Sequence, residues 1–323
     1  MILSQYLSLF LLLILNYSIK IMSKVNAKAK ASIHWFRKGL RLHDNPAFLE
    51  ACNNSEKIYP VFVIDPWFAK DIVGINRYAF LLQSLLDLDN SLKQLGSRLF
   101  VAKGKPEELI PELIERWDIT LLTFENDTEP YSIKRDTFIR SYCNNKVKVS
   151  AHATHTLHDP EAYKGYSGVN IPTTYQSFQK LFDNIGSVRK PVPKPTINEM
   201  PIKSSLDDYN ENEFHIPTLI EMCYTESYKM TYPGGETEAL RRMHQYVSSK
   251  PEFVCNFEKP NTSPNSILPS TTVLSPYIKF GCLSSSLFYH ELASIYKGKK
   301  HSSPPGIIII IIITYINILL LLF

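Results

Sequence analysis

The feature that most constrains this chain is a regular alternation of short β-type segments with helical segments. Apolar runs rich in β-branched and aromatic residues occur at 32–36, 58–64, 98–102, 119–124 and 147–151. The clearest helical segment between them is 75–95, where leucines recur at helical spacing before Gly96. Right-handed crossovers between such units predict an α/β fold with a doubly wound, mostly parallel five-stranded sheet over residues 31–152.

The composition changes after this region. Residues 153–230 are rich in Pro, Tyr, Asn and charge, and the segment PVPKP at 191–195 favours extended backbone. We expect a long connector here. Residues 231–305 return to helical patterns, the first at 236–249, and predict the start of an α-helical domain that is too short to build a core alone.

The two ends differ from the middle. Residues 1–30 contain an apolar run without a preceding basic residue or a following small-residue cleavage site. Residues 306–323 are a hydrophobic tail at the lower length limit for a membrane span. One interpretation is a signal anchor and a tail anchor. The other, favoured by the Ile, Leu, Asn, Tyr and Lys content, is that both ends are gene-model artefacts.

Charge and cysteine content bear on partners and compartment. The chain has 35 Lys and Arg and 31 Asp and Glu, and residues 1–30 hold four of the lysines and no acid. The remaining body is neutral and gives no electrostatic argument for a nucleic-acid partner. The five cysteines form no C-x-x-C pair. Scattered thiols are typical of a reducing compartment, and neither a disulfide frame nor a zinc site is expected.

A basic segment follows the first strand. Arg37, Lys38 and Arg41 lie at the carboxyl end of that strand, where doubly wound sheets bind ligands. They are candidates for binding an anion, and the alternative is a solvated basic loop. The same segment has no G-x-G-x-x-G, so a standard dinucleotide fingerprint is absent.

Two further clusters have structural interpretations. The acids Glu125, Asp127 and Glu129 follow the fourth strand, and capping of the next helix is favoured over acid–base chemistry. The histidines at 152, 155 and 158 have no supporting acids or thiols close in sequence, so no metal site is predicted.

Hydroxyl residues at 270–272 precede Ser275-Pro276, a pair that can begin a helix. Free N–H groups and hydroxyls at such a helix start can bind phosphate. The alternative is a cluster of N-cap residues without a ligand.

Three segments together resemble the photolyase/cryptochrome family: HWFRKGLRLHDNP at 34–46, GETEAL at 235–240 and TTVLSPYIKFGCLS at 271–284. The segments HTLHDPE at 155–161, TYQSF at 174–178 and NFEKPNTSPNS at 256–266 are most similar to the (6-4) DNA photolyase and animal cryptochrome branch. The resemblance covers about residues 31–305.

This resemblance implies an antenna domain at 31–152 and a partial FAD-binding domain at 231–305. FAD would be held by Thr271, Thr272, Leu274 and Ser275, with Phe257 as an aromatic contact. Many members also carry a folate or deazaflavin antenna, for which Arg37, Lys38 and Arg41 are the candidates. No catalytic residue is assigned, because the resemblance places those beyond residue 305.

The resemblance also implies function. In repair members, a carbon–carbon lyase reaction begins when excited reduced FAD passes an electron to a UV-induced pyrimidine photoproduct flipped out of the DNA. The first hypothesis is therefore a (6-4) photolyase, inactive in this truncated form. The alternatives are an animal-type cryptochrome that acts on light signalling or the circadian clock with clock proteins, and a membrane-anchored α/β nucleotide-binding module. We expect a monomer in the nucleus or cytoplasm.

Overall fold

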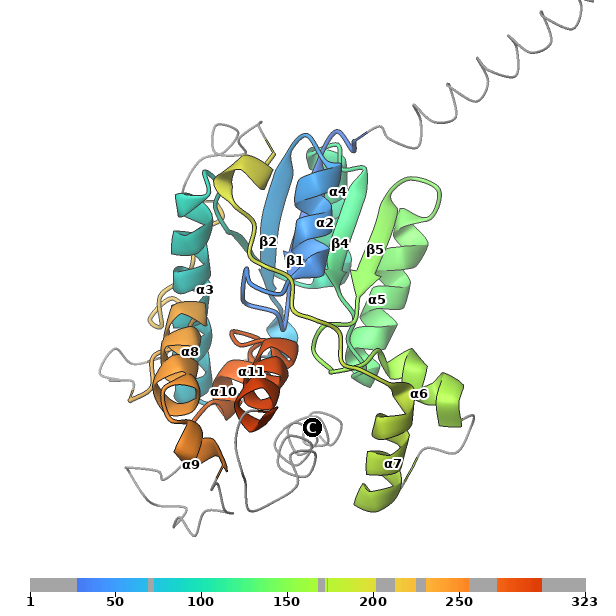
Figure 1. Cartoon of the computed structure of the whole chain (residues 1–323). Coiled ribbons are helices and arrows are strands. Elements are labelled where there is room, and N and C mark those ends of the chain that lie inside the picture. Colours follow the sequence, from blue (N-terminus) through green and yellow to red (C-terminus); the bar gives the residue numbers. More distant parts are fainter. Residues whose placement is uncertain are drawn as a thin grey trace, which may run out of the picture.

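The computed structural model describes residues 28–68, 73–167, 172, 174–201, 213–224, 231–255 and 272–297. Within them, one sheet has the order β3-β2-β1-β4-β5, and every pairing is parallel. The predicted doubly wound sheet is therefore confirmed (Figure 1). Its strands are β1 (Ser32–Phe36), β2 (Ile58–Ile64), β3 (Phe100–Lys103), β4 (Leu121–Glu125) and β5 (Lys148–His152).

Helices cover both faces of the sheet. Side chains of α2 (Pro46–Asn54) and α3 (Ile75–Gln94) enter one core cluster, and those of α4 (Pro106–Arg116) and α5 (Pro130–Cys143) enter the other. Helix α3 ends where the sequence predicts, with Gly96 at φ +74° in the left-handed conformation. The strand order reverses between β1 and β4, so the loops after these two strands meet at the switch point of the sheet.

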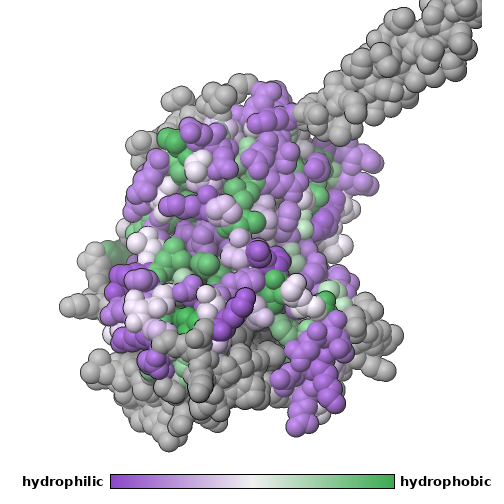
Figure 2. Space-filling view, in the orientation of Figure 1, coloured by the Kyte–Doolittle hydropathy of each residue, from purple (hydrophilic) through white to green (hydrophobic). Residues whose placement is uncertain are grey.

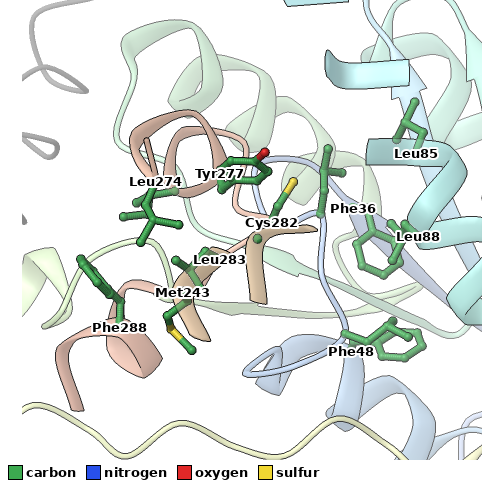
Figure 3. Close-up of a cluster of buried hydrophobic side chains, with 14 of the residues drawn as sticks. Phe36, Phe48, Leu85, Leu88, Met243, Leu274, Tyr277, Cys282, Leu283 and Phe288 are labelled. Atoms are coloured by element: carbon green, nitrogen blue, oxygen red, sulfur yellow. The ribbon is translucent and has the colours of Figure 1, made fainter. Parts of the chain in front are cut away.

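The helical segment packs onto the α/β part rather than around a core of its own. Apolar residues of the sheet and α3 share one buried cluster with residues of the C-terminal helices (Figure 3). These helices are α8 (Glu236–Met243), the π-helical turn His244–Ser248, α9 (Pro251–Cys255), α10 (Ser275–Lys279) and α11 (Ser285–Lys297). The domain boundaries predicted from the sequence stay a prediction.

The connector holds α6 (Pro160–Ser167), α7 (Tyr175–Ile185) and the short helix Ile197–Glu199. Between α7 and that short helix the chain runs in extended form along the α/β part (Figure 1). The carbonyl of Val192 accepts a hydrogen bond from the amide of Asp44 at 2.9 Å, and Cys52 Sγ donates to Met200 Sδ at 3.7 Å. The connector is thus attached to the α/β part at several points.

Hydrophilic side chains cover most of the face in Figure 2, with small apolar patches between them. In the part of the chain that is described, no helix combines the length and apolar character that a membrane crossing requires. The hydrophobic tail and residues 1–27 of the leader lie outside the described residues. All five cysteines are free thiols.

His34 on β1 is a buried titratable group inside the α/β core. Its Nδ1 lies 2.8 Å from Thr123 Oγ1, and its ring packs edge-on against Phe36 and Phe48. Burial lowers the pKa of His34 from 6.5 to about 3, with smaller effects from the charges of His152 and Arg37. The folded chain therefore keeps this ring neutral at pH values where the unfolded chain protonates it.

Acidification should weaken the fold through His34. Its contribution is fully present above pH 6.5 and is lost progressively as the pH falls toward about 3. A single such group changes the free energy of unfolding by about 1.4 kcal/mol per pH unit, or about 2 kcal/mol between pH 7 and pH 5. Urea unfolding at both pH values should show this loss in the natural chain and a smaller one in His34→Asn. Equal losses in the two proteins would contradict the assignment.

Candidate functional site

The loop at residues 37–45 leaves the carboxyl end of β1 at the switch point. Arg37 donates to Asp136 Oδ1 at 2.6 Å, and its guanidinium packs against the rings of Trp35 and Phe124, 4.9 and 4.5 Å from their centres. These contacts place Arg37 against α5 and β4 rather than in solvent.

The other two basic candidates also meet carboxylates. Lys38 Nζ lies 3.0 Å from Asp127 and 2.5 Å from Glu129. Arg41, which is fully buried, lies 3.2 Å from Glu125 Oε1. Burial raises the pKa of Asp127, but the charge and hydrogen bond of Lys38 outweigh it and hold that pKa well below its usual value.

The positive charges at this edge of the sheet are balanced by neighbouring carboxylates. Four basic side chains, with Arg135 as the fourth, face four acidic side chains: Glu125, Asp127, Glu129 and Asp136. An anion would have to compete with these carboxylates for the same cations. Binding of an anion or antenna by Arg37, Lys38 and Arg41 therefore stays a prediction.

The capping prediction for the three acids holds only in part. Asp127 accepts from the amide of Glu129 at 3.2 Å and from Ser132 Oγ at 2.9 Å. Glu129 occupies the N-cap position of α5 without a side-chain cap bond. Glu125 is buried instead, 3.3 Å from His155 Nε2. Lys38 and Arg41, which pair with Glu129 and Glu125, come from the loop after β1, and sequence spacing cannot reveal these contacts.

The histidines at 152, 155 and 158 have different partners. His152 Nε2 lies 2.7 Å from Glu50, and the ring of His158 packs on Phe182. No group of three or more potential ligands gathers into a metal site within the described residues.

The second half of the loop contacts the helical segment. Glu236, the first residue of α8, accepts from the amides of Leu42 and His43, both at 2.9 Å, and from His43 Nδ1 at 2.5 Å. His43 Nε2 accepts from the amide of Ser284 at 3.2 Å. His43 is therefore the neutral tautomer with its hydrogen on Nδ1.

Asp44 is the second buried carboxylate of this contact. It accepts two bonds from Arg189, at 2.5 and 2.8 Å, and one from the amide of Val192 at 3.0 Å. Ser284 Oγ also donates to Asp44 Oδ2. Asp44 thus joins the β1 loop, the connector and the start of α11.

The flavin candidates lie at the start of α10. Thr272, Leu274 and Ser275 share one turn there, whereas Thr271 and Phe257 lie outside the described residues. Leu274 is buried in the apolar cluster, so its backbone is the part that could meet a ligand. Ser275 is exposed, and the N-cap residue of α10 makes no side-chain cap bond.

Arg242 on α8 supports this turn and was not found by the sequence analysis. Its Nη2 donates to the carbonyl of Thr272 at 2.9 Å, and its guanidinium lies 5.2 and 5.0 Å from the ring centres of Tyr232 and Tyr246. Its Nε is buried and has no hydrogen-bond partner among the described residues. N–H and O–H donors of this kind suit the phosphates of FAD, so the donor chemistry fits the phosphate end of that cofactor.

Comparison with known proteins identifies the family of this chain. Residues 32–196 match the DNA photolyase family. Cryptochrome-1 from Macaca fascicularis is 43% identical over 282 residues, which cover 85% of this chain and 48% of that protein. The chain therefore spans about half the length of the curated relatives it matches.

Solved structures support the fold. A Synechocystis cryptochrome aligns with a TM-score of 0.73 at 20% identity, covering 91% of this chain and 61% of that one. An archaeal photolyase from Sulfolobus tokodaii, solved with two FAD molecules, aligns with a TM-score of 0.60 at 24% identity, covering 84% and 55%. At these identities the likeness establishes the fold alone.

Proposed function

Because the chain belongs to the DNA photolyase family, which includes the cryptochromes, we propose that it supplies the α/β domain and the first part of the FAD-binding domain of a light-dependent flavoprotein. The observation that carries the proposal is the set of donors at the start of α10, steadied by Arg242. Bound FAD would supply photochemical electron transfer. The residues of this chain would orient its phosphate end.

Within the family, we favour a cryptochrome role over DNA repair. The curated relatives at 41–43% identity are animal cryptochromes, and they match over 85% of this chain. Such a protein would act as a light receptor or circadian regulator together with clock proteins. We propose a location in the nucleus or cytoplasm.

The (6-4) photolyase is the second candidate, and the segments at 155–161, 174–178 and 256–266 support it. It would act on UV-damaged DNA as a carbon–carbon lyase. A blue-light assay on an oligonucleotide that carries a (6-4) photoproduct separates the two candidates only through a positive result, because both predict no repair by this chain. We expect no repair by this chain. Light-dependent repair would favour the photolyase.

Flavin titration of the purified full chain tests the site itself. We expect FAD to bind in the micromolar range or more weakly, and riboflavin, which lacks the phosphates, to bind more weakly still. The described donors belong to the phosphate end, so the difference between the two ligands is the diagnostic measurement. Equal affinity for FAD and riboflavin would contradict the proposed site. Stoichiometric, tightly held FAD would contradict the expected weakness.

A further inference from the structure

The segment GETEAL has no role in the proposed chemistry, yet the structure places it at a junction. Gly234 and Gly235 lie directly on α3, where an added Cβ would approach Phe80 O to 2.2 Å and Asp87 Cβ to 2.7 Å. The amide of Thr237 donates to Asp87 Oδ2 at 3.0 Å. Helix α8 therefore begins in close contact with the α/β part.

Glu236 fixes this start from the other side. Its carboxylate is buried and accepts hydrogen bonds from the N–H groups of Leu42 and His43 and from the His43 ring. The NH2 group of a glutamine here would find no acceptor in this set, because all three contacts are donors. The negative charge of Glu236 is thus specifically matched to the loop after β1.

Helix α8 connects Glu236 to the proposed phosphate-binding turn at residues 272–275. Arg242 lies less than two helical turns after Glu236, and it holds the carbonyl of Thr272 at 2.9 Å. The two residues stand near opposite ends of an eight-residue helix. A displacement of the start of α8 would be transmitted to Thr272 through one hydrogen bond.

We propose that Glu236 is a positioning residue for the phosphate-binding turn at 272–275, acting through α8 and Arg242. The expected effect of Glu236 on flavin binding rests on the proposed function. The structural coupling between Glu236 and the turn at 272–275 does not, because it can be measured without a ligand.

Amide hydrogen exchange in the full chain, without flavin, tests the link. Glu236→Gln replaces one of the two accepting oxygens with a donor, so we expect about tenfold faster exchange at the amides of Leu42 and His43. We expect the same increase at Ile278 in α10 and at Phe280, its C-cap residue. Amides of β1 and β4 should keep their rates. The matched control is Glu213→Gln, an exposed carboxylate paired with Arg116. Faster exchange at 42–43 with unchanged α10 amides would overturn the proposal.

A second variant keeps the test decisive if Glu236→Gln unfolds. Arg242→Gln removes the hydrogen bond between Arg242 and the carbonyl of Thr272. Exchange should then rise at Ile278 and Phe280 while Leu42 and His43 stay protected. Unchanged exchange in α10 of Arg242→Gln would also overturn the proposal.

Flavin titration adds a readout that general destabilisation would not produce. Glu236→Gln should weaken FAD about tenfold and leave riboflavin unchanged, because only FAD reaches the turn with its phosphates. If the natural chain does not distinguish FAD from riboflavin, the proposed function fails while the exchange result still decides the link. If exchange responds but FAD selectivity does not, Glu236 supports the fold only, and the positioning role is wrong.

Discussion

Replacing Gly281 with alanine should cost more than about 3 kcal/mol of stability, a large fraction of what a domain has. Gly281 has φ +67°, and a Cβ there would lie 1.5 Å from Lys38 O and 2.7 Å from Gly39 Cα. These are backbone atoms of the loop after β1, so they cannot move away as a flexible side chain would. The change should separate the loop from the turn after α10.

The separation has identifiable consequences. The amide of Leu40 donates to Phe280 O at 3.3 Å, and Arg41 Nη1 donates to Gly281 O at 2.9 Å. Both bonds join the two segments, and Arg41 is fully buried. Loss of its acceptor leaves a buried charge partly unpaired, which adds to the steric cost. Thermal and urea unfolding of the purified variant measure the total.

Two other glycines serve as matched controls. Gly96 has φ +74° and no heavy atom within 4 Å of an added Cβ, so Gly96→Ala isolates the backbone strain, worth about 1 kcal/mol. Gly74 has neither constraint, and Gly74→Ala should change stability by less than about 1 kcal/mol. If Gly281→Ala cost no more than Gly96→Ala, the close contact of the two segments would be wrong.

The sheet could be predicted from the sequence because its signals are local. The run at 58–64 forms β2 with the predicted bounds, and the helix at 75–95 differs from α3 by one residue. Hydrophobic periodicity and a terminal glycine determine such elements without long-range information. The predicted strand at 98–102 shifts to Phe100–Lys103, because pairing with β2 sets its register.

The site was harder to predict from the sequence than the sheet, because its contacts join segments far apart in the chain. Arg37 and Lys38 have the residue types of an anion site, but their carboxylate partners lie after β4 and on α5. The sequence shows Glu236 only as part of the segment GETEAL and predicts no role for it. A charged residue directly after two glycines at a helix start is the signal that could have directed attention to it. Its three donors could not be read from the sequence.

Replacing Asp44 with asparagine should destabilise the chain by about 3 kcal/mol, because one buried carboxylate joins three segments. Asp44 has φ +47°, a conformation that asparagine also adopts, so the substitution removes charge without new backbone strain. Arg189 would lose its bidentate partner, and Ser284 Oγ would lose a charged acceptor. Urea unfolding gives the magnitude. Faster proteolysis within 186–196 should show that the connector is released.

The pH dependence of Asp44 gives this prediction a second, independent measure. Burial raises the pKa of Asp44, but hydrogen bonds from Arg189 and Ser284 outweigh burial and lower it below 3.8. Its contribution is therefore present above pH 3.8 and is lost as the pH falls through the lower folded value. Asp44→Asn should lack this acid-dependent part. A double-mutant cycle with Arg189→Gln should show coupling of at least about 1 kcal/mol, and additive effects would mean that the pair does not hold the connector.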